Sequence, residues 1–349
     1  MFGERGSQQS ERLIVSVALK HRLDLGAIRL CATALEIFHY DPHMPDLPVK
    51  LAIIGGSGLG DALGSEQGTA HTLDTPFGKP SGPIVEVQWG GAPVLMLQRH
   101  GDGHVCNPSA VPYRANLFAL KTLGVTHILA SGATGSLREH LHPGELVIVD
   151  QVIDKTFKRP NTFYENAAVH VELAEPFCPV MRRWLVQAAR RLNTQQPGLN
   201  IHDGGTYVCM EGPAFSTRAE SEMHRQWGGD LIGMTVMPEA RLAREAEIAY
   251  AMIAMPTDYD CWKPHTLGTP AAPGSSNEPS ALLEEIIGNL KRATAANIAL
   301  MKEALSDPSV LLDQPSPAHE ALALGIWSDK SKIDPQEIQR LGPLWGRHF

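Results

Sequence analysis

Short apolar runs alternate with helical patterns along most of this chain, and this alternation limits the possible folds more than any other feature. The run Val49–Ile54 ends in Gly55-Gly-Ser-Gly58, which is typical of a buried strand that opens into a glycine turn. Further segments with strand character lie at 84–89, 93–98, 127–131, 146–152, 206–210, 231–234 and 249–254. The alternation predicts a single α/β domain in which helices flank a mixed, mostly parallel, twisted sheet.

The helical segments carry their own start and stop signals. Thr217-Arg-Ala-Glu220 is a capping box, and Gly124 is a stop signal at the end of an apolar helical pattern. A loop rich in Gly, Pro and Ser at 266–280 precedes the longest amphipathic pattern. The predicted helices cover 113–123, 180–192, 218–227, 238–246 and 283–305.

Composition divides the chain into three parts. Prolines and acidic residues at 41–48 are typical of a linker. We therefore predict an N-terminal extension at 1–45, a main domain at 46–306, and a tail at 307–349 that packs on the domain or on a neighbouring subunit. The extension resembles a signal peptide only weakly, because charges interrupt its apolar run and no small-residue cleavage site follows. A transit peptide is the alternative.

Charge and cysteine content exclude several classes of protein. The chain carries 30 Lys and Arg against 38 Asp and Glu, a net charge of -8, which predicts no general attraction to nucleic acid or to an anionic membrane. No uncharged apolar run reaches the roughly 18–20 residues that span a bilayer. Five widely spaced cysteines without a CxxC pair argue against a disulfide framework and a thiolate zinc site, and favour the reducing cytoplasm.

Two polar motifs that follow predicted strands have the residues to bind an anion. In Gly55–Gly58 the backbone N–H groups are open and Ser57 adds a hydroxyl, although a tight turn that binds nothing fits equally well. In the motif RHGDGH, Arg99 has the side chain best shaped for phosphate, and His100 and His104 add donors. A metal site formed by the His and Asp side chains of this motif and a plain surface loop are the alternatives.

Three further turns carry small, aromatic or acidic residues at strand ends. The segment Ala130–Ser136 is open enough to admit a ligand, or to let a strand and a helix pack closely. Phe215 could stack on a base, although an isolated Phe is more often part of a core. Asp258 and Asp260 could accept hydrogen bonds from an amine and share a proton with a ring nitrogen; an ordinary solvated turn is the alternative.

Taken together, these segments resemble the purine nucleoside phosphorylase superfamily and, within it, the phosphorylases of 5'-methylthioadenosine. The matching segments run in family order over about residues 49–263; they are IIGGSGLG, DTPFGKPSG, RHGDGH, NPSAVPYRAN, GSLRE, RPNTFY, AEPFCP, MEGPAFSTRAES, IGMTVMPEARLAREAEIAYA and TDYDCW. The resemblance implies a homotrimer that splits methylthioadenosine with phosphate, in purine and methionine salvage. The products would be adenine and 5-methylthioribose 1-phosphate.

The resemblance also assigns roles by position. Asp258 and Asp260 would be the catalytic residues at the base, with Asp258 near N7. The residues implied to bind phosphate are Ser57, Arg99, His100, Ala133 through its backbone, and Thr235. The residues implied to bind sugar and base are His104, His170, Phe215, Met234 and Thr257. No metal and no organic cofactor is implied, because phosphate is the co-substrate and placement and electrostatics account for the chemistry.

Three residues depart from the family pattern. Gly132 stands where a phosphate-binding Thr is usual, Ala214 where Arg is usual, and Gly233 where some members have Asn. Family members that cleave 6-oxopurine nucleosides have Asn in the turn that here holds two Asp residues, so adenine is the expected base. Three alternatives stay open: a phosphorylase of adenosine or inosine-type nucleosides, a noncatalytic nucleotide-binding module, and a noncatalytic family member.

Overall fold

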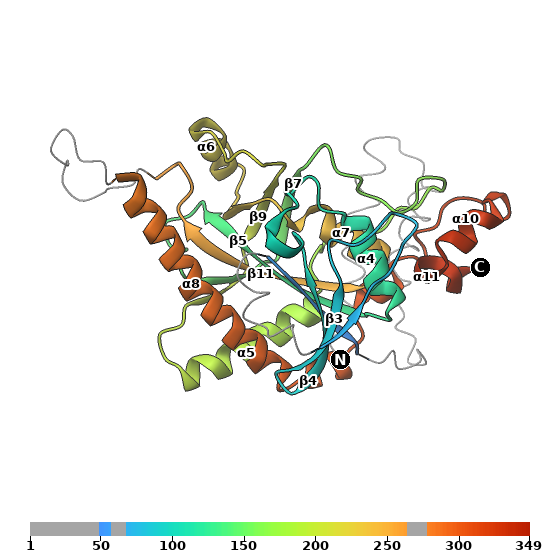
Figure 1. The fold of residues 1–349 in the computed structure, drawn as a ribbon, viewed down its shortest axis with the longest axis horizontal. Helices are drawn as coiled ribbons and strands as arrows, with labels where there is room; N and C mark the ends of the chain where they lie inside the picture. The colour runs from blue at the N-terminus through green and yellow to red at the C-terminus, as the bar shows by residue number, and fades with distance from the viewer. Residues whose placement is uncertain (1–48, 57–67, 264–277) are drawn as a thin grey trace, which may run out of the picture. The chain divides into compact units, whose positions relative to one another are not determined.

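The computed structural model describes residues 49–56, 68–263 and 278–349 of the 349-residue chain. Every described residue belongs to one compact unit, which spans residues 48–349. Figure 1 shows the described part as a ribbon in which helices flank a central sheet. The predicted domain boundaries at 45/46 and 306/307 stay predictions.

Within the described residues, eleven strands form one mixed sheet, which confirms the predicted α/β class. Strands pair in the order β2-β3-β4-β1-β5-β10-β9-β7, while β11 pairs with β5 and β6, and β6 also pairs with β8. Parallel pairing joins β1 to β4 and β5, and β5 to β11. The strands are β1 Leu51–Gly55, β2 Thr69–His71, β3 Ile84–Trp89, β4 Ala92–Gln98, β5 His127–Ser136, β6 Leu146–Ile148, β7 Gln151–Lys155, β8 Ile201–Asp203, β9 Thr206–Met210, β10 Leu231–Gly233 and β11 Ala249–Asp258.

Six strands differ from the sequence pattern. β5 and β11 pair in parallel from His127 and Ala249 as far as Gly135 and Asp258. The sequence pattern ends β5 at Ser131 because small residues follow. These residues have a low strand propensity, but their pairing with β10 and β11 keeps them in the strand. The segment 146–152 was expected to be one strand, but it is divided between β6 and β7, which pair with different neighbours. The sequence pattern does not predict the short strands β2 and β8.

Helices cover both faces of the sheet. Alternate side chains of β1 divide between the faces: Ala52 and Ile54 join a core with α4 and α7, whereas Leu51 and Ile53 join a core with α5 and α8. Figure 1 shows α5 and α8 on the same side of the sheet, where they approach each other at an angle. The helices are α4 Tyr113–Thr122, α5 Pro179–Gln195, α6 Arg218–Gln226, α7 Val236–Glu245 and α8 Glu278–Leu305.

Two local predictions about helix starts have different outcomes. The capping box is confirmed, because Thr217 accepts from the N–H of Glu220 and the Glu220 carboxylate accepts from the N–H of Thr217. The predicted loop at 266–280 is too long, because α8 begins at Glu278. Residues 266–277 lie outside the described residues.

The tail adds to both cores: Leu311 joins the core that contains α5 and α8, and Leu341 and Leu344 join the core that contains α4 and α7. It forms the short helices α9 Ser309–Asp313, α10 Pro335–Arg340 and α11 Gly342–Trp345. Trp345 is fully buried, and its ring lies 4.8 Å from the ring of Tyr164. Arg347 forms an ion pair with the buried Glu247, and Nε2 of His348 lies 3.2 Å from its carboxylate. In the described ranges, no helix is long and apolar enough to cross a membrane.

Candidate active site

The strand β5 reaches the surface at one point. Its first six residues are buried, Ala133 is exposed, and Thr134 is buried again. Ala133 pairs with Met255, so this opening lies near the carboxyl ends of the parallel strands β5 and β11. Ligands of α/β sheets bind at the carboxyl ends of strands, and candidate residues lie on both sides of this opening.

Arg99, the residue after β4, is fully buried and its guanidinium is held in one orientation. Its Nε and Nη2 donate to the two carboxylate oxygens of Glu239 on α7 at 2.8 and 2.9 Å, and Nη1 donates to the carbonyl of Ser131 at 3.0 Å. Burial alone would lower the pKa of Arg99, but the charge and hydrogen bonds of Glu239 raise it above its ordinary value. Among the described residues, these bonds leave one N–H on each of Nη1 and Nη2 for a further acceptor.

Two glycines and a threonine border the space beside Nη1 of Arg99. A Cβ on Gly56 would lie 3.4 Å from this Nη1, and a Cβ on Gly132 would lie 3.8 Å from it and 3.5 Å from Oγ1 of Thr235. The structure therefore brings Arg99, Thr235 and the backbone at Gly132 and Ala133 together. A guanidinium, a hydroxyl and open backbone suit a phosphate anion, although their role stays a prediction. Ser57 lies outside the described residues.

The sequence predicts that His100 donates a hydrogen bond to the anion, but the structure favours the opposite direction. Its Nδ1 lies 2.7 Å from the carbonyl of Cys106, so this nitrogen carries the hydrogen. Burial lowers the pKa of His100 to about 4, and the neutral ring then offers a lone pair at Nε2. His100 can thus accept a hydrogen bond from a phosphate hydroxyl rather than donate one. The exposed ring of His104 stacks on it at 4.1 Å.

The two candidate catalytic carboxylates lie in a tightly bonded turn at the end of β11. Oδ2 of Asp258 accepts from the Thr257 hydroxyl at 2.8 Å, and Oδ1 accepts from the N–H of Asp260 at 2.8 Å. Oδ2 of Asp260 accepts from the hydroxyl of Ser221 on α6 at 2.5 Å. A Cβ on Gly135 would lie 3.2 Å from both Oδ1 of Asp258 and Cβ of Asp260. The turn therefore rests directly on β5.

Two groups of residues lie along β5. The anion-type cluster consists of Arg99, Gly132 and Thr235, and the carboxylate turn consists of Thr257, Asp258 and Asp260. Gly132 belongs to the first, and Gly135 borders the second. Three residues of a strand span about 10 Å, so both clusters border the same end of β5, on either side of the exposed Ala133 along the strand. The arrangement can thus hold a nucleoside with a phosphate at the sugar and acidic groups at the base.

The remaining predicted residues divide into two groups. Thr257 and Met234 belong to the site: Thr257 supports Asp258, and the side chain of Met234 packs over Gly212. The roles of Phe215 and His170 stay predictions. Phe215 is 85% exposed, and the carbonyl of its neighbour Ser216 accepts from Sγ of Cys261. The exposed His170 packs its ring 4.7 Å from Trp327 of the tail.

At two of the positions where the sequence departs from the family, a large neighbouring side chain occupies the space that a side chain would need. A Cβ on Gly233 would lie 1.9 Å from the hydroxyl oxygen of Tyr207, which also accepts from the N–H of Thr235 at 3.4 Å. A Cβ on Gly132 would lie 3.2 Å from the terminal methyl of Met252. The third departure, Ala214, is exposed and nothing in the structure explains it.

Sequence reasoning missed several residues that shape the site. Glu239 fixes Arg99, Gly135 makes room for the carboxylate turn, and Ser221 binds Asp260. An acidic residue within the otherwise apolar start of α7 was the available signal for Glu239. Gly135 lies within Ala130–Ser136, which the sequence marks as open, but its contact with the carboxylate turn has no local signal, and no local pattern marks Ser221.

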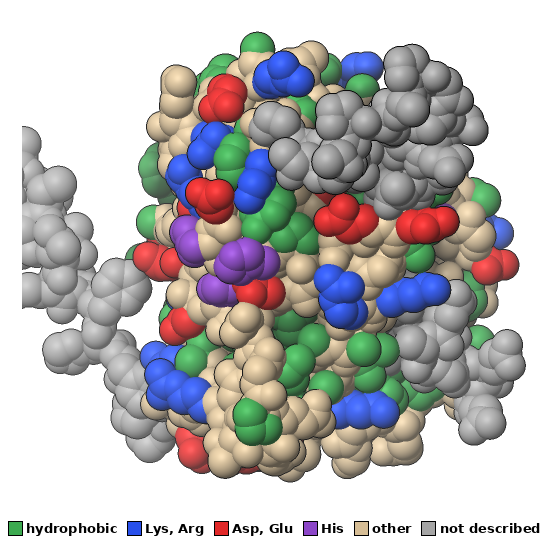
Figure 2. All heavy atoms as spheres, turned by 90° about the vertical axis from the view of Figure 1, so that its left-hand side faces the viewer, with side chains coloured by type: hydrophobic (Ala, Val, Ile, Leu, Met, Phe, Trp, Pro, Cys, Tyr) green, Lys and Arg blue, Asp and Glu red, His purple; other side chains and the backbone are tan. Residues whose placement is uncertain are grey.

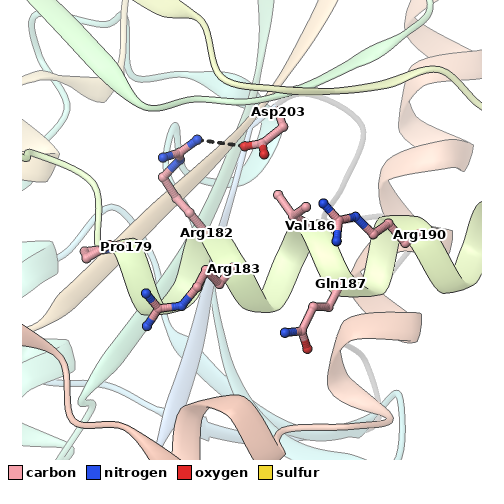
Figure 3. A pocket seen from close by; sticks show the side chains of 7 residues that line it. All are labelled: Pro179, Arg182, Arg183, Val186, Gln187, Arg190 and Asp203. Atoms are coloured by element: carbon pink, nitrogen blue, oxygen red, sulfur yellow. Dashed lines mark hydrogen bonds and ion pairs between the residues drawn. The ribbon is translucent and has the colours of Figure 1, made fainter.

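A separate hollow of about 380 Å³ lies along α5, and none of the candidate residues lines it. Arg182 is paired with Asp203 at 2.8 Å, and Arg183 donates to Gln314. Figure 3 shows the guanidinium groups of Arg182, Arg183 and Arg190 pointing in different directions. These donors do not converge on one point, so the hollow is not assigned a ligand.

Histidine and acidic side chains gather on the face shown in Figure 2. His142 and His202 each contact the carboxylate of Glu145, at 3.1 and 2.7 Å. Across the described ranges, no group of three or more His, Cys, Asp or Glu side chains is arranged to hold a metal ion. The expected lack of a metal requirement stays a prediction.

The chain belongs to the Phosphorylase superfamily, whose sequence model matches residues 50–306. It is similar to the S-methyl-5'-thioadenosine phosphorylase of Thermosynechococcus vestitus, with 41% identity over 308 residues, 87% of this chain and 100% of that one. A solved methylthioadenosine phosphorylase from an Antarctic soil metagenomic library superposes with a TM-score of 0.74 at 42% identity, over 85% of this chain and 98% of that one. A variant of the adenosine/methylthioadenosine phosphorylase of Schistosoma mansoni, solved with methylthioadenosine, has a TM-score of 0.68 at 35% identity, over 80% and 99%.

Proposed function

We propose that this chain catalyses the phosphorolysis of S-methyl-5'-thioadenosine to adenine and 5-methylthioribose 1-phosphate. The observation that carries the proposal is the alignment along β5 of the cluster at Arg99, Gly132 and Thr235 with the turn at Asp258. The similarity to methylthioadenosine phosphorylases over nearly the whole length of those chains supports the choice of substrate.

The proposed chemistry follows from the two ends of the site. Phosphate lies against Arg99 and Thr235, below the sugar, where its charge stabilises the oxocarbenium-like sugar that forms as the base departs. It then attacks the anomeric carbon. His100 accepts a hydrogen bond from a phosphate hydroxyl and keeps the anion oriented.

At the other end, the departing adenine gains negative charge. We assign to Asp258, in its carboxylic acid form, the donation of a proton to N7 as the bond between sugar and base breaks, which leaves Asp258 as a carboxylate. The carboxylate of Asp260 accepts from the 6-amino group. Thr257 and Ser221 hold the two carboxylates in place. Met234 supports the sugar.

The direct experiment is phosphate-dependent adenine release from methylthioadenosine by the full chain, followed by chromatography. Adenosine and inosine are measured beside it. Adenosine is a second candidate substrate, because one similar chain is named for both adenosine and methylthioadenosine. Release of adenine without phosphate, or of hypoxanthine as the main base, would contradict the proposal. Activity that survives extensive treatment with a chelator would support the proposed lack of a metal.

We further propose a homotrimer that works in the cytoplasm. Large exposed apolar side chains, including Phe157 at 76% and Leu324 at 87%, support contact between subunits. The described cysteines, Cys106, Cys178, Cys209 and Cys261, are free, which suits a reducing compartment. Light scattering at micromolar concentration tests the assembly, and a mass equal to the chain mass of 37.9 kDa would contradict it.

A further inference from the structure

The buried Arg159, which belongs to neither end of the site, bonds to the segment that carries Met234 and Thr235 and to the end of β9. Arg159 lies in the loop after β7, and its side chain has no exposed surface. Its Nη1 donates to the carbonyls of Met234 and Met237, each at 2.6 Å. Its Nη2 donates to the carbonyl of Glu211 at 2.6 Å and to that of Met210 at 3.4 Å.

These carbonyls lie just beyond the parallel ladder of β9 and β10, whose last pair is Cys209 and Gly233. Met210 and Glu211 end β9, whereas Met234 and Met237 enclose the turn between β10 and α7 that holds Thr235. A buried carbonyl needs a hydrogen-bond donor, and Arg159 supplies donors to both segments where the β9–β10 ladder has ended.

The charge of Arg159 is compensated locally. Its Nε lies 3.3 Å from Oε1 of Glu211. Burial favours the neutral carboxyl, but hydrogen bonds from Ser109 and from the N–H groups of Phe157 and Lys158 outweigh it, so the pKa of Glu211 lies below its ordinary value. The pair therefore stays ionised, and a single substitution leaves an uncompensated buried charge.

Met234 is restrained from a second direction. Gly212 follows Glu211 and has a φ of 69°, and a Cβ at this position would lie 2.5 Å from Sδ of Met234. The main chain of Met234 is thus held by Arg159, and its side chain rests on the glycine. Both restraints act on the residue next to Thr235.

We infer that Arg159 is a positioning residue that sets the Met234–Thr235 turn for sugar and phosphate, an inference that rests on the proposed function. It touches neither the carboxylate turn nor Gly135 in the described part of the chain. Loss of its geometry should therefore weaken phosphate binding and leave adenine binding unchanged.

The test uses Arg159→Lys, which keeps the charge but cannot bond both segments with a planar fork. The phosphate KM should rise and kcat should fall, each by about tenfold, because small misplacements of reacting groups have effects of at least this size. The inhibition constant of adenine should stay within about twofold, because the carboxylate turn is untouched.

Arg244→Lys is the matched control, because Arg244 is also buried and donates to two main-chain carbonyls, those of Glu172 and Glu175, away from the site. It should change neither constant. If Arg159→Lys does not fold, Glu211→Gln is used instead, because it removes the charge that compensates Arg159. It should likewise raise the phosphate KM and leave the inhibition constant of adenine unchanged. A parallel loss of phosphate and adenine binding, or no loss of either, would overturn the inference. An inactive wild type would instead reject the proposed function.

Discussion

Gly135 of β5 lies opposite Asp258 of β11 in the parallel ladder, and a Cβ on this glycine would lie 3.2 Å from Oδ1 of that carboxylate. It would also lie 2.9 Å from Cγ2 of Ile232. The chain can place its carboxylate turn here only because position 135 has no side chain.

Gly135→Ala should therefore damage both stability and the base site. We expect a loss of about 1–3 kcal/mol in the free energy of unfolding, the usual cost of overpacking, and a lower kcat/KM for adenine nucleosides. Urea unfolding and steady-state kinetics measure the two effects. Gly342→Ala is the control, because a Cβ there meets nothing within 4 Å. Wild-type kinetics in Gly135→Ala would show that the turn does not depend on this contact.

Asp258→Asn should change the choice of base. The amide cannot transfer the proton that departing adenine requires, so adenine release should fall by roughly 10²–10⁴-fold, the scale of general acid catalysis. The same amide can donate to a 6-oxo group, so inosine-type substrates should lose less. The measured quantity is the ratio of kcat/KM for adenosine and inosine. Asp203→Asn, on β8, should leave the ratio unchanged; an unchanged ratio in Asp258→Asn would remove this residue from the base site.

Comparison of Arg99→Met with the double variant Arg99→Met, Glu239→Gln should separate the effect of Arg99 on stability from its effect on phosphate binding. The single change leaves the buried Glu239 unpaired and should cost about 3–5 kcal/mol of stability. Arg99→Met combined with Glu239→Gln should recover most of this loss but none of the phosphate affinity. Phosphate KM and urea unfolding are measured for both variants. Recovered phosphate affinity in the double variant would place the anion elsewhere.

His127 should make the fold sensitive to acid. Its Nδ1 bonds to the Thr126 hydroxyl, and burial lowers its pKa from 6.5 to about 3. Between these values the unfolded state binds more protons, so the contribution of His127 to stability falls as pH falls through this window. From pH 7.5 to 5 the share of the loss that belongs to His127 should be about 2 kcal/mol. Only this share should be missing in His127→Gln, because His100 also has a lowered pKa and acts in the same sense.

Glu245 provides the internal check on that experiment, because it acts in the opposite sense. Burial raises its pKa from 4.5 to about 7, so the folded state binds more protons between these values and gains stability on acidification. Glu245→Gln should remove this gain and steepen the acid-induced loss. Urea midpoints of both variants and the wild type at the two pH values separate the contributions. Identical pH profiles in all three proteins would contradict both assignments.

The sequence predicts well those features that depend on neighbours along the chain. Alternating apolar residues place Ile84–Trp89 in a strand, and the pattern Thr217-x-x-Glu220 starts a helix where it predicts one. Glycine turns after strands locate the segments that form the two ends of the site. Each of these signals depends on the order of a few consecutive residues.

Contacts between distant residues have no such signal. Glu239 meets Arg99 across 140 positions, and the hydroxyl of Tyr207 occupies the space that a side chain at 233 would need. The hydrogen-bonding sense of His100 depends on the carbonyl of Cys106, which only the folded loop brings near. The family pattern assigned residues to the site, but their partners emerged only from packing.

The position of the two ends of the site on a single strand restricts how this chain can vary. Deletion or insertion of one residue between Gly132 and Gly135 would shift the two ends relative to each other by about 3.3 Å and turn alternate side chains to the opposite face. Variation in this segment should thus occur by exchange of residues at constant length. Changes of length that preserve catalysis should instead lie in surface loops.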